Sequence, residues 1–240
     1  YLPSRYEDRN SRGNGAYKTS DRIWLNALWA TDASRSLSFS TSIGGLQEDL
    51  GDWTLSLTAG VTARLSDSLY FDLDLAYKRR TGWVVYQGGR EFGAFDAIDL
   101  QPSFDLNWFL AADHQIKFSF QWAGVKAYER QAYRVPSADG ALQRRAGAAG
   151  PRDFTVSLLT TQVRYRWEIA PLTDFYVVYN RGNQLPPTEA DAFGDLLSDA
   201  FQDPVVSSLV VSSRVVSSQV VSSQVESSQV VSSQVVSSQV

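Results

Sequence analysis

The feature that most constrains this chain is a segment in which serine and apolar residues alternate. Residues 35–43 read R-S-L-S-F-S-T-S-I, and the same two-faced pattern recurs in most later segments. Because successive side chains of a β-strand point to opposite faces, each segment has one apolar and one polar surface. These runs extend over about 9–13 residues, close to the ~9–11 that a tilted strand needs to cross a bilayer. Strands of soluble proteins usually have about 5–6 residues, so the length favours a membrane strand.

The alternating pattern predicts about eight strands. Short turns near positions 32, 66, 112 and 171 alternate with long loops near positions 48, 87, 138 and 192. Short turns at one rim and long loops at the other are typical of outer-membrane barrels. We interpret segment 1–20 as a loop, 79–95 as a loop or a strand extension, and 188–200 as a short helix. The predicted strands are approximately 21–31, 35–43, 53–64, 69–78, 98–108, 116–122, 154–168 and 174–180.

Aromatic residues on the predicted apolar faces occur at two depths. One set lies beside the short turns and the other beside the long loops. Two such girdles are expected where the lipid bilayer meets water. The candidate girdle residues are Trp29, Phe71, Trp108 and Trp167 beside the short turns, and Trp53, Tyr77, Trp122 and Tyr179 beside the long loops.

Charged residues within the predicted strands fall on the polar faces. A charge that faces lipid at mid-membrane costs roughly 2–4 kcal/mol, which explains why they would avoid the apolar faces. The polar faces would line a lumen, either with solvated structural pairs or with a selectivity lining. The short turns would place Asn107 opposite Lys117 and Arg166 opposite Val178. The candidate lumen residues are Arg64, Asp72, Asp74, Asp99, Asp105, Lys117, Arg164, Arg166 and Glu168.

The composition excludes several classes of protein. A net charge of −4 argues against a nucleic-acid partner. The absence of cysteine removes disulfides and cysteine-based metal sites. No apolar stretch is long enough for a transmembrane helix. The chain has no methionine and begins at Tyr1, so we expect it to be a fragment or a processed product.

The sequence offers no convincing catalytic group. Its single histidine, His114, is expected in a surface turn, and no second histidine or cysteine could complete a metal site or a nucleophile–base pair. Glu91 with Asp96, or Glu129 with Asp139, could be taken for a glycosidase carboxylate pair, but such pairs arise by chance in any loop-rich chain. We therefore expect no enzyme activity, no cofactor and no metal.

The C-terminal segment, 205–240, is a pentapeptide repeat of the type V-V-S-S-Q. A five-residue period moves the apolar pair to the opposite strand face in each copy, and it holds no stripe on a helix. We predict a low-complexity segment that is disordered or a sequence artefact, and that could form β-structure on aggregation.

The chain also resembles the end of a Gram-negative outer-membrane protein family. In that family a family-9-like carbohydrate-binding module precedes a C-terminal domain of unknown function that is similar to an outer-membrane barrel. The resemblance covers about residues 1–204 and implies no catalytic residues. It also implies a closing strand after Asp203-Pro204. Beyond about Val211, the pentapeptide repeat replaces the sequence pattern of such a strand. The segments that carry it are 118–128 (F-S-F-Q-W-A-G-V-K-A-Y), 162–182 (Q-V-R-Y-R-W-E-I-A-P-L-T-D-F-Y-V-V-Y-N-R-G) and 193–204 (F-G-D-L-L-S-D-A-F-Q-D-P).

These observations lead to one main hypothesis and one alternative. Residues 1–204 are predicted to form the C-terminal part of an all-β, antiparallel, up-and-down transmembrane β-barrel. It would act in the bacterial outer membrane as a pore or as an anchor, with lipid, and a polysaccharide or small solute, as partners. Its strands would pair with strands outside this segment. The alternative is a soluble all-β carbohydrate-binding or interaction module.

Overall fold

The computed structural model describes residues 1–13, 16–136, 139–145, 152–185, 192–202 and 206–215. The fold is all-β, with one large antiparallel sheet, one small sheet and one short helix. This confirms the predicted all-β class. Within the described ranges, no helix has both the length and the apolar character needed to cross a membrane.

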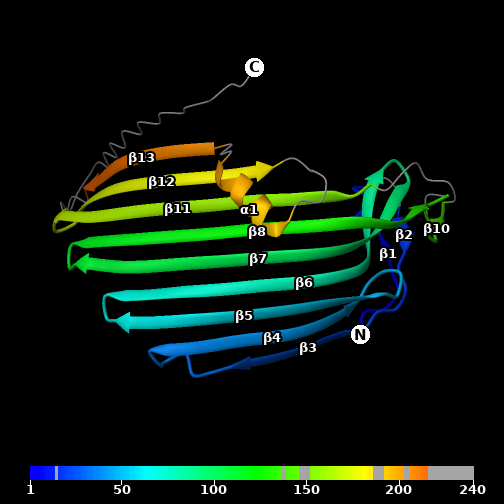
Figure 1. The fold of residues 1–240 in the computed structure, drawn as a ribbon, viewed down its shortest axis with the longest axis horizontal. Helices are drawn as coiled ribbons and strands as arrows, with labels where there is room; N and C mark the ends of the chain where they lie inside the picture. The colour runs from blue at the N-terminus through cyan, green and yellow to red at the C-terminus, as the bar shows by residue number, and fades with distance from the viewer. Residues whose placement is uncertain (14–15, 137–138, 146–151, 186–191, 203–205, 216–240) are drawn as a thin grey trace, which may run out of the picture.

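The large sheet is an up-and-down meander in which sequence neighbours pair (Figure 1). Its two edges, the first and the last strand, do not pair with each other in the described part of the chain, so the sheet is open. The strands are β3 (Trp24–Ala30), β4 (Leu37–Gln47), β5 (Trp53–Ser66), β6 (Leu69–Gly88), β7 (Glu91–Ala111), β8 (His114–Arg134), β11 (Phe154–Ala170), β12 (Thr173–Leu185) and β13 (Val206–Val215).

The long loop expected near position 87 is wrong, and the strand-extension interpretation of 79–95 is confirmed. β6 and β7 continue to a tight turn around Gly88 and Gly89. Both glycines have positive φ, +118° and +56°, which side chains disfavour. The chain therefore reverses within a few residues, and β8 likewise extends to Arg134, close to the long loop expected near position 138.

The extended strands carry a small packed unit that we call the cap, which comprises the described residues of 1–22, 48–52, 79–96 and 128–145. The segment predicted as an N-terminal loop contributes two short strands to it, and the small sheet orders them as β1-β2-β9. These strands lie at one end of the large sheet (Figure 1). The short strands are β1 (Tyr6–Glu7), β2 (Ala16–Lys18), β9 (Asp139–Gly140) and β10 (Gln143–Arg144), the last of which pairs with β8.

The predicted helix is present as α1 (Phe193–Gln202), while residues 188–191 of the prediction lie outside the described residues. Its buried side chains, Leu196 and Ala200, pack on Trp122 of β8 and Leu159 of β11. The helix therefore lies against the large sheet.

The start of the pentapeptide repeat forms a ninth long strand. β13 pairs with β12 along its whole length, with Leu209 opposite Tyr179 and Val211 opposite Val177. Ten residues of the repeat thus form the edge strand of the sheet, with Leu209 and Val211 on the apolar face. Residues 216–240 lie outside the described residues.

Candidate functional site

One face of the large sheet, which we call the apolar face, is exposed over most of its width. It carries the side chains predicted to face lipid, and no second layer of described residues covers them except beneath α1. Large contiguous apolar patches on soluble monomers rarely exceed a few hundred Å², so this face is a candidate interaction surface. Its exposed members include Leu25, Trp29, Phe39, Ile43, Trp53, Leu55, Leu73, Leu75, Trp108, Val163, Trp167 and Leu209.

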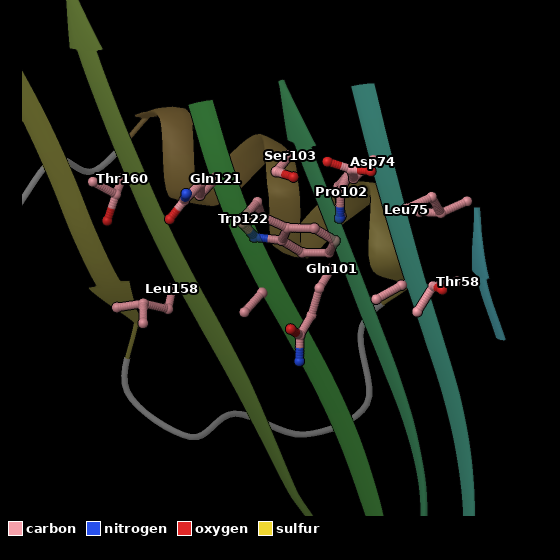
Figure 2. Close-up of a pocket in the computed structure, with 12 residues that line it drawn as sticks. Thr58, Asp74, Leu75, Gln101, Pro102, Ser103, Gln121, Trp122, Leu158 and Thr160 are labelled. Carbon is pink, nitrogen blue, oxygen red and sulfur yellow. The ribbon is translucent and has the colours of Figure 1, made fainter. Parts of the chain in front are cut away.

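The opposite side, the polar face, contains a hollow of about 430 Å³ near the middle of the sheet. Figure 2 shows the hollow with side chains from β5 to β11 around it, and α1 lies beyond the strands. Amide and hydroxyl groups share the lining with apolar side chains, which expose the larger part of its surface, and Asp74 supplies one carboxylate. The hollow thus presents both polar and apolar groups. The polar-face side chains of the hollow are those of Thr58, Asp74, Gln101, Ser103, Gln121 and Thr160.

A glycine makes room for the carboxylate of this hollow. Gly60 of β5 pairs directly with Asp74 of β6. A Cβ atom at position 60 would collide with Asp74 Oδ1 and lie close to the Ser40 hydroxyl. The missing side chain therefore allows the Asp74 carboxylate to lie over β5.

The charged residues of the polar face form an acidic row next to a basic row. Asp72 of β6 lies directly opposite Asp105 of β7. Two residues closer to the short turns, Lys117 of β8 lies opposite Arg164 of β11. As predicted, it also lies opposite Asn107 of β7. Like charges that face each other across strands destabilise a dry sheet. Their pairing indicates a hydrated face.

Nearest the short turns, Arg166 forms ion pairs with two carboxylates. Its Nε lies 2.8 Å from Asp174 Oδ1, and its guanidinium lies 3.2 Å from Glu168. The predicted pairing of Arg166 with Val178 is wrong, because Arg166 lies opposite Tyr176. The turn is tighter than expected: the strands pair up to Ala170, and Leu172 adopts a positive φ of 65°.

Two further candidate lumen residues have different environments. Arg64 is exposed at the short-turn end and forms no ion pair within the described residues. Asp99 is buried, at 3% exposure, and one of its oxygens lies 3.0 Å from the Arg80 guanidinium. Its other oxygen has no hydrogen-bond partner in the described part of the chain. Asp99 thus belongs to the junction between sheet and cap, whereas Arg64 lies at the rim.

The candidate girdle residues mostly lie on the exposed apolar face. Trp29, Trp53, Trp108 and Trp167 are exposed, and Phe71, Tyr77 and Tyr179 are half-buried. Trp122 differs from the expectation: only 3% of it is exposed, because α1 covers it.

Comparison with known proteins supplies a family but no activity. Over residues 4–215, the chain matches the family described as Domain of unknown function (DUF5916). The chain belongs to this family. No curated protein and no solved structure matches it.

The carboxylates considered as catalytic pairs in this DUF5916 chain form ion pairs with arginines in and next to the cap. Arg152 lies 2.7 Å from Glu129 and 3.7 Å from Glu91. Arg130 lies 3.8 Å from Asp96, and the side chain of Asp139 lies outside the described residues. The ion pairs give these groups a structural role.

His114 of the DUF5916 chain also has structural partners. Its Nδ1 lies 2.6 Å from the Tyr165 hydroxyl, and its ring stacks on Trp167 with centroids 5.6 Å apart. In the ranges that the structure describes, no group of three histidine, cysteine or acidic residues could hold a metal ion.

Burial changes the titration of two cap residues. Burial, followed by a hydrogen bond to Asp49, raises the pKa of the Tyr17 hydroxyl. Burial also raises the pKa of the Glu48 carboxyl, against the opposing effect of a hydrogen bond donated by Thr54.

Sequence reasoning missed the polar anchors of α1. Ser157, Arg181 and Asn183 lie on the apolar face, and each donates a hydrogen bond to a carbonyl of the helix. Polar residues at apolar-face positions next to a predicted helix were the available signal.

Proposed function

We propose that this DUF5916 chain is the C-terminal portion of an outer-membrane β-barrel, with lipid against its apolar face and water against its polar face. The observation that carries this proposal is one oblique band of aromatic residues on the apolar face. The band follows from the cross-strand register.

Cross-strand pairing defines rows that run at right angles to the strands. One such row on the apolar face serves as a reference. It joins Phe39 of β4 to Arg181 of β12 through Val61, Leu73, Phe104, Phe120 and Thr161.

The four short-turn aromatics step steadily across these rows. Trp29 on β3 lies two residues from the reference row on the long-loop side. On the short-turn side, Phe71 lies two residues away, Trp108 four and Trp167 six. The shift from Trp29 is therefore about 1.4 residues per strand. With about 3.3 Å per residue and about 4.8 Å between strands, the band makes an angle of about 45° with the rows.

The short turns follow the same slope. At the β3–β4 end, the turn begins at the reference row itself, because the Thr31 amide donates a hydrogen bond to the carbonyl of Phe39. At the β11–β12 end, the last cross-strand pair includes Thr173. This pair lies eight residues from Arg181, and therefore eight residues from the reference row. Strands of outer-membrane barrels tilt by about 35–45°. A tilt of this size would bring the aromatic band and all the short turns to one depth in a membrane.

The polar face supports a hydrated passage, or the interior of an anchor for a carbohydrate-recognising module. Its hollow and its charged rows need water or a polar solute. The open edges β3 and β13 expose backbone groups that lipid cannot satisfy. In a membrane these edges pair with strands of a longer chain or of a second copy.

Reconstitution tests the two parts of this proposal separately. The chain, refolded in detergent and transferred to phosphatidylcholine vesicles, is expected to float with the vesicles after an alkaline wash. Conductance in planar bilayers would support the pore, and its absence in an inserted protein would leave the anchor. A detergent-free monomer with a sharp thermal transition would contradict membrane insertion and support the soluble module.

A further inference from the structure

We propose that α1 takes the place of lipid on β8, β11 and β12, and that it marks the outer boundary of the bilayer on this side of the sheet. This inference rests on the proposed membrane function. It assigns a role to a helix that the strand pattern leaves unexplained.

The helix covers part of the same face that is exposed elsewhere. Leu159, Leu196 and Ala200 are at most 1% exposed where α1 meets the sheet. Phe201 stacks on Phe120 with parallel rings whose centroids are 6.0 Å apart. These contacts are those of a protein core, so lipid cannot reach this area while α1 is docked.

Polar residues of the sheet hold the helix at this place. The Trp122 indole donates to the Ser157 hydroxyl at 3.0 Å, and that hydroxyl donates to the Leu196 carbonyl at 3.0 Å. The Asn183 amide donates to the Ala200 carbonyl at 3.2 Å, and Arg181 donates to Phe201. Without the helix, these groups would face hydrocarbon unsatisfied, which costs several kcal/mol for each backbone group and comparably for polar side chains.

The outer side of α1 is unsuited to hydrocarbon. Asp195, Ser198 and Gln202 are exposed on it. A charged side chain such as Asp195 is unfavourable on a lipid-facing surface. The helix therefore belongs at the level of the headgroups or beyond them.

The register places the Trp122 contact of α1 in the upper third of the apolar belt, just below that level. Trp122 lies on β8 about seven residues beyond the aromatic band, which corresponds to a height of about 17 Å for strands tilted by 45°. Trp53 on β5 lies about nine residues beyond the band, or about 20 Å. The apolar belt of such barrels is about 25 Å tall, so both residues approach its upper edge. Trp53 is exposed and Trp122 is covered.

This pair provides the experiment. Variants that retain one tryptophan, at position 53, 108 or 122, are placed in vesicles whose lipids carry bromine on the acyl chains. Trp53 and Trp108 should be quenched, and Trp122 should be quenched several-fold less. Leu196→Asp, which undocks α1, should raise the quenching of Trp122 to that of Trp53.

The outcomes separate this inference from the proposed function. Equal quenching of Trp122 and Trp53 with α1 intact would overturn the role of α1 alone. No quenching of Trp108 would overturn membrane insertion and this inference with it. Because the chain has no cysteine, Ser198→Cys gives a second test that leaves all tryptophans in place. Its thiol should react in intact vesicles with a maleimide that cannot cross membranes, and protection from the reagent would contradict the inference.

Discussion

The cap and the short-turn half of the large sheet place their aromatic residues in opposite environments. In the cap, Tyr17 and Phe92 are at most 1% exposed and pack edge to face with centroids 5.1 Å apart. In the short-turn half, Trp29 and Trp108 are 59% and 41% exposed. The cap therefore has a hydrophobic core of its own, whereas the sheet leaves most of its apolar face exposed.

Charges differ between the two regions in the same way. In the cap, arginines meet carboxylates, as where Arg22 lies 2.5 Å from Asp49 and Arg130 lies 3.1 Å from Asp52. In the short-turn half, Arg166 meets Glu168 and Asp174, whereas Lys117 and Asp105 form no ion pair among the described residues. One chain thus combines a region with a packed core and paired charges with a sheet that has one polar face and one exposed apolar face.

The largest expected effect tests whether the cap has its own core. Phe92→Ala removes a buried ring between Tyr17 and Tyr86, and we expect it to destabilise the cap by about 3–5 kcal/mol. Denaturant unfolding, monitored by hydrogen exchange of the cap amides, would measure the loss of stability. Leu55→Ala is the control, since that side chain is exposed on the apolar face. Equal losses from the two variants in detergent-free buffer would break the comparison.

The next effect tests the partner of the sheet. Leu73→Arg places a charge in the middle of the apolar face, and in vesicles it should destabilise the protein by about 2–4 kcal/mol. Ser119→Arg is the matched control, because position 119 lies on the polar face opposite Asp105 and should tolerate the charge. Unfolding in guanidinium from lipid vesicles gives both values. If Leu73→Arg changes stability by no more than about 0.5 kcal/mol, as at an ordinary surface site, water already covers this face.

A smaller effect concerns the backbone of the junction between cap and sheet. Gly82 has a φ of +67°, and a Cβ atom there would collide with the Asp52 carboxylate. Gly82→Ala should cost about 1–2 kcal/mol from the left-handed backbone alone, and more from the collision. Gly13→Ala isolates the first contribution, because Gly13 has a φ of +78° and no atom near its Cβ position. Thermal unfolding of both variants should show the larger loss for Gly82→Ala.

The smallest effect is a pH dependence confined to the cap. The raised pKa of Glu48 means that the folded state keeps its proton to higher pH than the unfolded state. Its contribution to stability is therefore complete below the ordinary value of 4.5 and is lost as pH rises through the folded pKa. Glu48→Gln should flatten this fall and stabilise the cap at neutral pH. Unfolding curves across the acidic to neutral range would check it, and an unchanged slope would contradict the role of Glu48.

The sequence predicted the strands well, because the alternation of polar and apolar residues that marks a strand lies within the strand itself. The alternation of 35–43 and 53–64 placed β4 and β5 within a few residues, and the short turn after Leu106 and Trp108 fixed the pairing of Asn107 with Lys117. The extension of β6 and β7 was only one of two interpretations, since the glycines of 79–95 are equally typical of a loop. The pairing of β6 with β7, and of β7 with β8, settles that segment as strand.

The sequence predicted the sheet face on which each candidate residue lies, but it predicted less well which residues pack against it. Alternation assigned Asp72, Asp105 and Lys117 to the polar face, but it could not show that Asp99 is buried beside Arg80. It also placed Trp122 toward lipid, where α1 in fact covers it. Side-chain direction follows from the strand itself, whereas burial depends on which distant segment packs against it.

The sequence alone thus determined the two-faced strands, their antiparallel order and the separation of charge from the apolar face, because a strand directs successive side chains to opposite sides. Only the tertiary structure decided the cap core, the site of α1 and the oblique alignment of Trp29, Phe71, Trp108 and Trp167. Those features depend on register between strands and on contacts across many residues of chain. No local periodicity encodes them.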